Sequence, residues 1–231
     1  MIIERGYICS NLLDSELWKS LLEEWCLTTE RFCRVANSIP NLYFGNVRGQ
    51  KGAAPYWFCE RAAVSHLLAA VAKIGVAVLG EGGCEKTTTK DGRNDLWFCS
   101  SISYGIEAKH SYFDSDGNLD AQNARVCIQK GLNDACDDVQ QLPEKFADHC
   151  VGVFFIWPRF IGDDNELTED DITLKIQNLL DIFKRVAQQE PINCDAFAWC
   201  FPPETRNNWW NGFYCPGILL IAKEVVCKAV Q

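Results

Sequence analysis

The stretch NDLWFCSSISYGIEAKH, residues 94–110, consists of two short apolar segments joined by serines. Such segments are typical of β-strands that pack into a core. Each nevertheless carries charge: Asp95 lies in the first, and Glu107 and Lys109 lie in the second. Charged side chains are rarely buried without a partner or a ligand, because losing their hydration costs free energy. The three charges therefore point to a function for this part of the chain.

We predict that residues 94–99 and 102–110 form two neighbouring strands of a hairpin. Side chains two apart on a strand point to the same face, about 6.6–6.8 Å from each other. Glu107 and Lys109 then project together, and Asp95 can lie beside Glu107. Two carboxylates that close repel each other unless a proton or a cation separates them. Hard divalent ions such as Mg²⁺ bind oxygen ligands, so the carboxylate pair predicts a metal site at the sheet edge.

Helical spacing of apolar residues predicts helices before and after this hairpin. Thr168 can cap the last helix, and Gly75 is placed to end an earlier one. Residues 38–55 are rich in Asn, Gly and Pro, and the polar residues 81–93 predict a loop or a hairpin tip. The predicted helices cover residues 14–26, 28–37, 56–73, 118–141 and 168–187, and the predicted strands cover 76–80, 94–99, 102–110, 150–157, 196–201 and 217–222.

The order of these elements predicts an α/β protein with a mixed central β-sheet flanked by helices. We interpret residues 1–231 as a single domain, because no repeat or linker-like stretch divides the chain. Residues 1–50 would form an N-terminal helical cap, residues 56–157 the core, and residues 168–231 a C-terminal helix with further strands.

Composition limits the classes of function. Of the 231 residues, 48% are apolar and 23% are charged, as in an ordinary globular protein. The formal net charge of −9 argues against broad, sequence-blind binding to nucleic acid, although a local basic rim is compatible with it. No apolar run approaches the roughly 20 residues of a membrane-spanning helix. The first residues lack the features of a signal peptide, so we expect a cytoplasmic protein with no membrane partner.

Thirteen cysteines are scattered along the chain without a CxxC pair. A zinc site usually has close-set ligand pairs, and a disulfide framework belongs to small secreted domains. Free thiols that serve as small buried apolar residues are the favoured interpretation. The alternative is an iron–sulfur or zinc site formed by Cys194, Cys200 and Cys215 with a distant fourth ligand.

The segment DSDGNLD, residues 114–120, begins like a calcium-binding loop. Its sixth position should be Gly but is Leu119, and its twelfth should be Glu but is Arg125. We therefore interpret it as a turn followed by a helix cap.

The three histidines show no spacing suited to a zinc site or a catalytic triad. His66 lies beside Leu67 on a predicted helix, and we expect it to be structural. His110 follows Lys109 on the predicted strand, so its side chain should point away from the carboxylates and receives no catalytic role.

Basic and aromatic residues are candidate contacts for a nucleic acid. Lys86, Lys90 and Arg93 precede the charged strand and can bind phosphate if their loops converge; ordinary solvated charge is the alternative. Trp209 and Trp210 belong to an aromatic cluster whose ring faces can stack unpaired bases. Such a cluster can equally cover an apolar seam or contact a partner protein.

The charged residues resemble the motif of the PD-(D/E)xK nuclease superfamily, which has the restriction-endonuclease-like fold. The family core is a helix, a three-stranded meander, a helix and a further strand, which is the predicted order of residues 56–157. The motif places an acidic residue on the second strand, here Asp95, and (D/E)xK on the third, here Glu107 and Lys109. Many members also carry a Glu on the first helix, where Glu60 stands.

The resemblance has departures. Asn94 stands where the motif often has Pro. Some members follow with a Gln and a Tyr on the next helix, and this chain offers Gln122 and Gln129 without the Tyr. We keep Gln122 as a candidate nucleic-acid contact, but no subfamily follows.

The resemblance also implies a role for each residue of the motif. Asp95 and Glu107 would hold Mg²⁺ or Mn²⁺, and Glu60 would bind a second ion or its waters. Lys109 would orient the attacking water or help to deprotonate it. A phosphodiester is anionic and poorly electrophilic, so its hydrolysis needs cations on the phosphate and an activated hydroxide.

The implied function is a metal-dependent nuclease, most simply a DNA endonuclease of restriction, defence or repair type. RNA or single-stranded ends remain alternative substrates, and a homodimer or a partner protein is suggested by fold analogy alone. The competing class is a catalytically inactive nuclease-fold protein that acts as a protein-interaction module. A purely structural interpretation would pair Asp95 and Glu107 with Arg93, Lys109 or Arg61 as ordinary salt bridges.

Overall fold

The computed structural model of the chain describes residues 5–9, 12, 15–38, 54, 56, 59–86, 89–115, 119–143, 145–162, 167–205, 209–210 and 212–226, without the side chains of 84–86, 89–92, 209 and 210. Most of the loop predicted at residues 38–55 lies outside this description. The helices are α1 (Ser15–Ser38), α2 (Glu60–Lys73), α3 (Ala121–Val139) and α4 (Glu169–Ala187).

The strands are β1 (Arg5–Cys9), β2 (Ala77–Lys86), β3 (Thr89–Cys99), β4 (Ser103–Asp114), β5 (His149–Ile161), β6 (Ala196–Cys200), β7 (Trp209–Trp210), β8 (Phe213–Tyr214) and β9 (Ile218–Val225). The main sheet has the order β1-β6-β9-β5-β4-β3-β2, while β8 pairs with the end of β5 and with β7. Strands β4 and β5 pair in parallel, and the other neighbours in this order pair antiparallel. The predicted α/β class with a mixed sheet flanked by helices is therefore confirmed.

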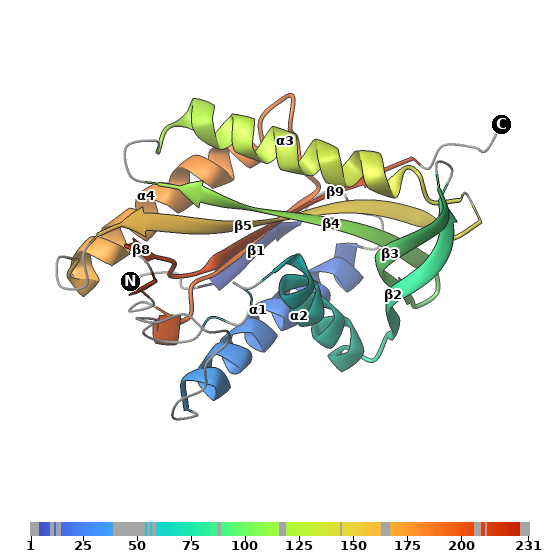
Figure 1. Cartoon of the computed structure of the whole chain (residues 1–231), viewed down its shortest axis with the longest axis horizontal. Helices are drawn as coiled ribbons and strands as arrows, with labels where there is room; N and C mark the ends of the chain where they lie inside the picture. Colours follow the sequence, from blue (N-terminus) through green and yellow to red (C-terminus); the bar gives the residue numbers. More distant parts are fainter. Residues whose placement is uncertain are drawn as a thin grey trace.

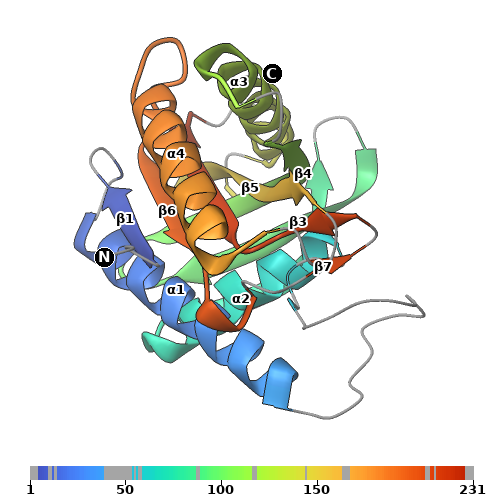
Figure 2. The same cartoon turned by 90° about the vertical axis from the view of Figure 1, so that its left-hand side faces the viewer.

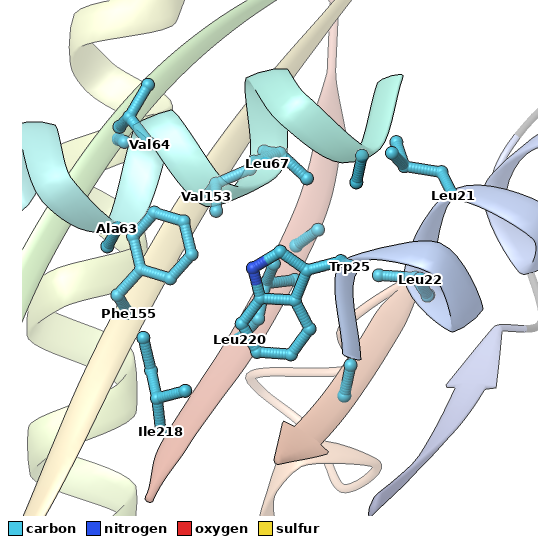
Figure 3. Packing of buried hydrophobic residues seen from close by; sticks show 14 of the residues in the cluster. Leu21, Leu22, Trp25, Ala63, Val64, Leu67, Val153, Phe155, Ile218 and Leu220 are labelled. Carbon is cyan, nitrogen blue, oxygen red and sulfur yellow. The ribbon is translucent and has the colours of Figure 1, made fainter. Parts of the chain in front are cut away.

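Helices cover both faces of the sheet (Figures 1 and 2): α1 and α2 lie on one face, and α3 and α4 lie on the other. We call the two interiors the α1–α2 core and the α3–α4 core. Strand β5 contributes to both, because alternate residues point to opposite faces. Figure 3 shows Trp25 of α1 beside the strands that carry Phe155 and Leu220. The sheet residues of the α1–α2 core include Leu96, Phe98, Tyr104, Ile106, Ala108, Val153 and Phe155, and those of the α3–α4 core include Phe113, Phe154, Ile156, Leu219 and Ile221.

Helix α3 packs unusually close to the sheet because a glycine of the helix faces the sheet and a glycine of the sheet faces the helix. A Cβ built on Gly131 would lie 2.1 Å from the ring of Phe154, and one on Gly152 would lie 2.8 Å from the backbone nitrogen of Cys136. Only glycine permits so short an approach of backbone to backbone. As a result, α3 lies directly over β4 and β5, where the charged residues of β4 are found.

Local signals at the helix ends match the sequence predictions. Thr168 forms a capping box at the start of α4: its hydroxyl accepts a hydrogen bond from the Asp171 N–H at 3.1 Å, and the Asp171 carboxylate accepts one from the Thr168 N–H at 3.0 Å. Helix α2 ends at Lys73, and Gly75 follows with a φ of +79°. The left-handed conformation is accessible to glycine without a steric penalty, so it stops the helix here.

The N-terminal region departs from the predicted helical cap. Residues 14–26 and 28–37, predicted as two helices, form the single helix α1, because Thr28 and Thr29 are buried within it rather than exposed in a turn. Residues Arg5–Cys9 form the strand β1, which pairs with β6 inside the sheet. This strand has only five residues, and such a short segment carries too little alternation to be recognised.

Most of the polar segment 81–93, for which the sequence predicts a loop or hairpin tip, belongs to β2 and β3. Their pairing runs from Ala77 opposite Cys99 to Lys86 opposite Thr89. Leu79, Glu81 and Gly83 of β2 are exposed, so apolar burial leaves no pattern in this part of the sequence. Backbone hydrogen bonds between the strands hold the hairpin instead.

The cysteines are only partly as predicted. Many are free and buried, and burial raises the pKa of Cys33, Cys194 and Cys200, which keeps these thiols protonated. Cys150, however, is disulfide-bonded, whereas the sequence favoured free thiols. The proposed cluster of Cys194, Cys200 and Cys215 is not formed, since Cys194 lies in the α3–α4 core and the other two lie in the α1–α2 core.

Among the helices that the structure describes, none has both the length and the apolar character of a membrane span.

His66 is structural, as predicted. It is 4% exposed, its Nδ1 lies 3.2 Å from the hydroxyl of Thr29, and its ring stacks on Phe32. Burial lowers the pKa of His66 from 6.5 to about 4, so the imidazole is neutral in the folded protein at neutral pH.

We expect the free energy of unfolding to fall as the pH drops from 6.5 to about 4, because the unfolded chain takes up a proton at His66 and the folded chain does not. The shift corresponds to roughly 3 kcal/mol. Urea unfolding at pH 7 and pH 4.5 measures the change, and a His66→Gln variant should lose this part of it. An identical pH dependence in the two proteins would contradict a neutral buried His66.

Candidate functional site

The two charged strands separate beside Asp95. Pairing between β3 and β4 runs from Cys99 opposite Ser103 to Leu96 opposite Ile106. At the next position, the Asp95 carboxylate accepts a hydrogen bond from the backbone N–H of Ala108 at 2.7 Å. A side chain thus takes the place that a backbone carbonyl of β3 would occupy in a continued ladder. We call this point, with Asp95, Glu107 and Lys109, the β3–β4 fork.

The three charged side chains share the face of the sheet that α3 covers. Ile106 and Ala108 belong to the α1–α2 core, so Glu107 and Lys109 between and after them point to the opposite face. The same alternation on β3, where Leu96 enters the α1–α2 core, places Asp95 on the α3 face. The structure therefore brings Asp95, Glu107 and Lys109 together on one face.

Glu107 is only 3% exposed, although it carries a carboxylate. It lies opposite Gly152 in the parallel pairing of β4 with β5. Because Gly152 has no side chain, α3 can lie close above this position, and the helix covers Glu107. Removing a carboxylate from water costs several kcal/mol even when it has a partner. A buried carboxylate of this kind is most easily explained if its negative charge has a function.

Lys109 contacts an acidic residue that the sequence did not indicate. Its Nζ lies 2.6 Å from Oδ2 of Asp138, near the end of α3, and both side chains are about one third exposed. Burial alone would lower the pKa of Lys109, but the hydrogen bond and charge of Asp138, with the charges of Glu60 and Glu107, raise it above its ordinary value. Lys109 is therefore cationic and held in place. The only sequence signal for Asp138 is its position near the end of the helix predicted at residues 118–141.

Glu60 lies at the start of α2, which covers the other face of the sheet. Its Oε2 is 3.3 Å from Nδ1 of His110, whose ring packs 4.4 Å from that of Trp157. His110 thus points away from Glu107, as predicted. The charge of Glu60 raises the pKa of Lys109. Glu60 does not, however, join Asp95 and Glu107 in a set of metal ligands. Within the described part of the chain, no group of three His, Cys, Asp or Glu side chains is placed to hold a metal ion.

Two carboxylates remain as candidate metal ligands at the fork. Mg²⁺ in phosphate-transfer sites is commonly bound through one or two carboxylates, with waters and substrate phosphate completing its shell. Asp95 and Glu107 are carboxylates of that kind on one face of the sheet, and Oδ2 of Asp95 also accepts the hydrogen bond from the Ala108 N–H. Their oxygens are of the type that a hard divalent ion binds, and the described residues place no third carboxylate with them as the resemblance implied.

The residues considered as ordinary ion-pair partners for the fork bind elsewhere. Arg61 Nε lies 3.0 Å from Oε1 of Glu81, and Arg93 Nη1 lies 3.8 Å from Oε2 of the same residue. Lys109 binds Asp138. In these contacts the three cations pair with carboxylates other than Asp95 and Glu107, while the charge of Glu107 still raises the pKa of Lys109.

Of the candidate nucleic-acid contacts, Arg93 alone lies beside the fork in the described structure. The side chains of Lys86 and Lys90 lie outside the description, as do those of Trp209 and Trp210. Strand β7, which carries the two tryptophans, joins the sheet through β8 at Phe160 and Ile161 of β5. That end of β5 is about 30 Å along the strand from Gly152, so the aromatic hairpin is remote from the fork.

Gln122 does not lie at the fork either. It is exposed in the first turn of α3, whereas Asp138, which contacts Lys109, is in the last turn. Sixteen residues of helix separate them, which corresponds to about 24 Å. The sequence-based placement of Gln122 near the motif is therefore not supported.

In comparisons with known proteins, no family model, no curated protein and no solved structure matches this chain.

Proposed function

We propose that this protein is a Mg²⁺-dependent nuclease (Mn²⁺ serving as well), a DNA endonuclease of restriction, defence or repair type that acts in the cytoplasm. The observation that carries the proposal is the β3–β4 fork. There, Asp95 binds the N–H of Ala108, which lies between Glu107 and Lys109. Two carboxylates and an ammonium from two neighbouring strands are thereby held on one face of the sheet.

The order of elements around the fork gives independent support. Helix α2, the meander β2–β3–β4, helix α3 and strand β5 follow one another in the order that the resemblance to the PD-(D/E)xK superfamily implies. The acidic residue lies on the second strand of the meander, and Glu107 and Lys109 lie on the third. An α/β sheet alone would not carry a function, so the argument rests on these side chains.

Each residue of the fork has a role in the proposed hydrolysis. Asp95 and Glu107 would bind Mg²⁺, which supplies positive charge to the phosphate and lowers the pKa of a bound water. Lys109 carries a fixed positive charge because Asp138 holds its ammonium in place. It orients the attacking water and offsets the negative charge that develops on the phosphate oxygens. Glu60 contributes through its charge near Lys109.

The direct test is to incubate the purified protein with supercoiled plasmid, single-stranded DNA and RNA, in Mg²⁺, in Mn²⁺ and in EDTA. We expect cleavage of plasmid DNA that requires the metal and is lost in both Asp95→Ala and Lys109→Ala. Cleavage that survives both substitutions would come from a contaminant. The RNA and single-stranded arms decide between the substrates that the resemblance leaves open.

A protein-interaction module is the second candidate function. It is favoured by the net charge of −9 and by the aromatic cluster that includes Trp209 and Trp210 in the sequence. It predicts that the wild-type protein, folded by circular dichroism, cleaves none of the three substrates with either metal. That outcome would replace the nuclease proposal.

A further inference from the structure

Beside the fork, Glu81 adopts a backbone conformation that is unusual for its residue type. It lies in β2 between the pairs Gly80–Leu96 and Gly82–Asn94, and therefore opposite Asp95. Its φ is +50°, in the left-handed region that a side chain with a Cβ rarely adopts. Such strained conformations are found mostly at functional sites. The contacts of the Glu81 side chain indicate which function this strained residue could serve.

Two arginines converge on the Glu81 carboxylate from different elements. Arg61, in the first turn of α2, and Arg93, on β3, bind its two oxygens at 3.0 and 3.8 Å. The side chains of the arginines are 73% and 71% exposed, and that of Glu81 is 46% exposed. The group therefore carries a net charge of about +1 at the surface, in a protein whose total charge is strongly negative.

Arg93 lies beside the fork, and Arg61 reaches the same Glu81 carboxylate from α2, which covers the opposite face of the sheet. Arg61 follows Glu60 directly, and Arg93 precedes Asp95 by two residues on the same strand. Residues two apart on a strand lie about 6.6–6.8 Å from each other. A phosphate bound at Arg93 would thus lie close to Asp95, and an anionic chain that also reaches Arg61 would cross the edge strand β2.

We propose that Arg61 and Arg93 bind the phosphate backbone of a nucleic acid, and that Glu81 occupies their guanidinium groups in the free protein. This inference rests on the proposed nuclease function and names its substrate-binding residues. A carboxylate and a phosphate present similar oxygens to arginine, which binds either one through paired N–H donors. The positive φ holds the Glu81 carboxylate between the arginines, so that both are oriented before the substrate arrives.

The exchange of Glu81 for phosphate has a small energetic cost. Exposed ion pairs add little to stability, because water solvates both partners well. A nucleic acid gains in addition from the release of counterions on each phosphate contact. Glu81 would therefore weaken binding without preventing it, and its removal should tighten binding.

The test is fluorescence anisotropy of a labelled DNA duplex in EDTA, where binding is measured without cleavage, over a series of salt concentrations. We expect Arg61→Ala and Arg93→Ala each to weaken binding at least about threefold and to reduce the salt slope by about one. Glu81→Gln, which keeps the size of the side chain, should tighten binding by a similar factor. The variants change exposed residues, and circular dichroism confirms their folding.

Matched controls change the same charges at the other end of the molecule. Arg185→Ala and Asp181→Asn alter exposed residues of α4, far from the β2–β3 hairpin (Figure 1). If they change the affinity as much as the fork variants do, only net charge matters and the proposal is overturned. It is also overturned if neither wild type nor Glu81→Gln binds DNA. If Arg61→Ala and Arg93→Ala leave the affinity unchanged while cleavage is intact, the arginine site is rejected and the nuclease proposal stands. If the expected binding pattern is seen without any cleavage, the arginine site stands and the nuclease proposal is rejected.

Discussion

Substituting Glu107 with glutamine is expected to lower metal-dependent DNA cleavage at least about a hundredfold while leaving the protein as stable as the wild type or more stable. A metal ion supplies several kcal/mol of transition-state stabilisation, and each 1.36 kcal/mol corresponds to a factor of about ten in rate. Glutamine keeps the shape of glutamate but has no charge with which to bind Mg²⁺.

The predicted stability has a separate physical reason. Glu107 is 97% buried, since its exposed fraction is 3%, and a buried carboxylate costs more free energy than a buried amide of the same size. Residues that reduce stability while serving a function are typical of active sites. Opposite effects of one substitution on activity and on stability would therefore distinguish a functional Glu107 from a structural one.

Plasmid cleavage and urea unfolding of the same preparations measure the two effects. Glu16→Gln serves as the control, because the side chain of Glu16 is 83% exposed and pairs with Lys19 across the surface of α1. It should change neither quantity measurably. A loss of several kcal/mol of stability in Glu107→Gln, with cleavage retained, would instead make Glu107 part of a buried ion pair without a catalytic role.

Much of the fold was predictable because its core elements are long and periodic. The apolar run of β5 and the stripe of α4 with its Thr168 cap are strong local signals. Prediction from local sequence failed where tertiary contacts determine the structure. Thr28 and Thr29 favour a helix break by their propensity, but their burial against Lys73 and His66 keeps α1 continuous.

The candidate site was predictable only along the strands. A period of two relates Glu107 to Lys109, and hairpin pairing brings Asp95 to them. Sequence spacing does not say on which face of the sheet a helix packs, so it placed Glu60 with the carboxylates although α2 covers the opposite face. For the same reason it missed Asp138 and Glu81, whose contacts with Lys109, Arg61 and Arg93 arise from packing and pairing of distant segments.

Replacing Trp25 with alanine is expected to destabilise the whole protein by about 3–5 kcal/mol. Trp25 is wholly buried, and its ring lies 6.4 Å from that of Phe155 on the central strand β5. Truncation would leave a cavity between α1 and the sheet. Because domains of this size are stable by only about 5–15 kcal/mol, the midpoint of urea unfolding should fall clearly.

Two further substitutions show whether packing is the cause. Among the described residues, the Trp25 indole N–H has no hydrogen-bond partner, so Trp25→Phe removes an unfavourable buried group and should lose less than half as much stability as Trp25→Ala. Val35→Ala, at a position of α1 that is 51% exposed, should change stability by less than about 0.5 kcal/mol. If Trp25→Ala instead melted α1 alone and left the unfolding midpoint unchanged, α1 would be an appended cap on an independently stable sheet. A single cooperative loss would make the helix part of the core that positions the β3–β4 fork.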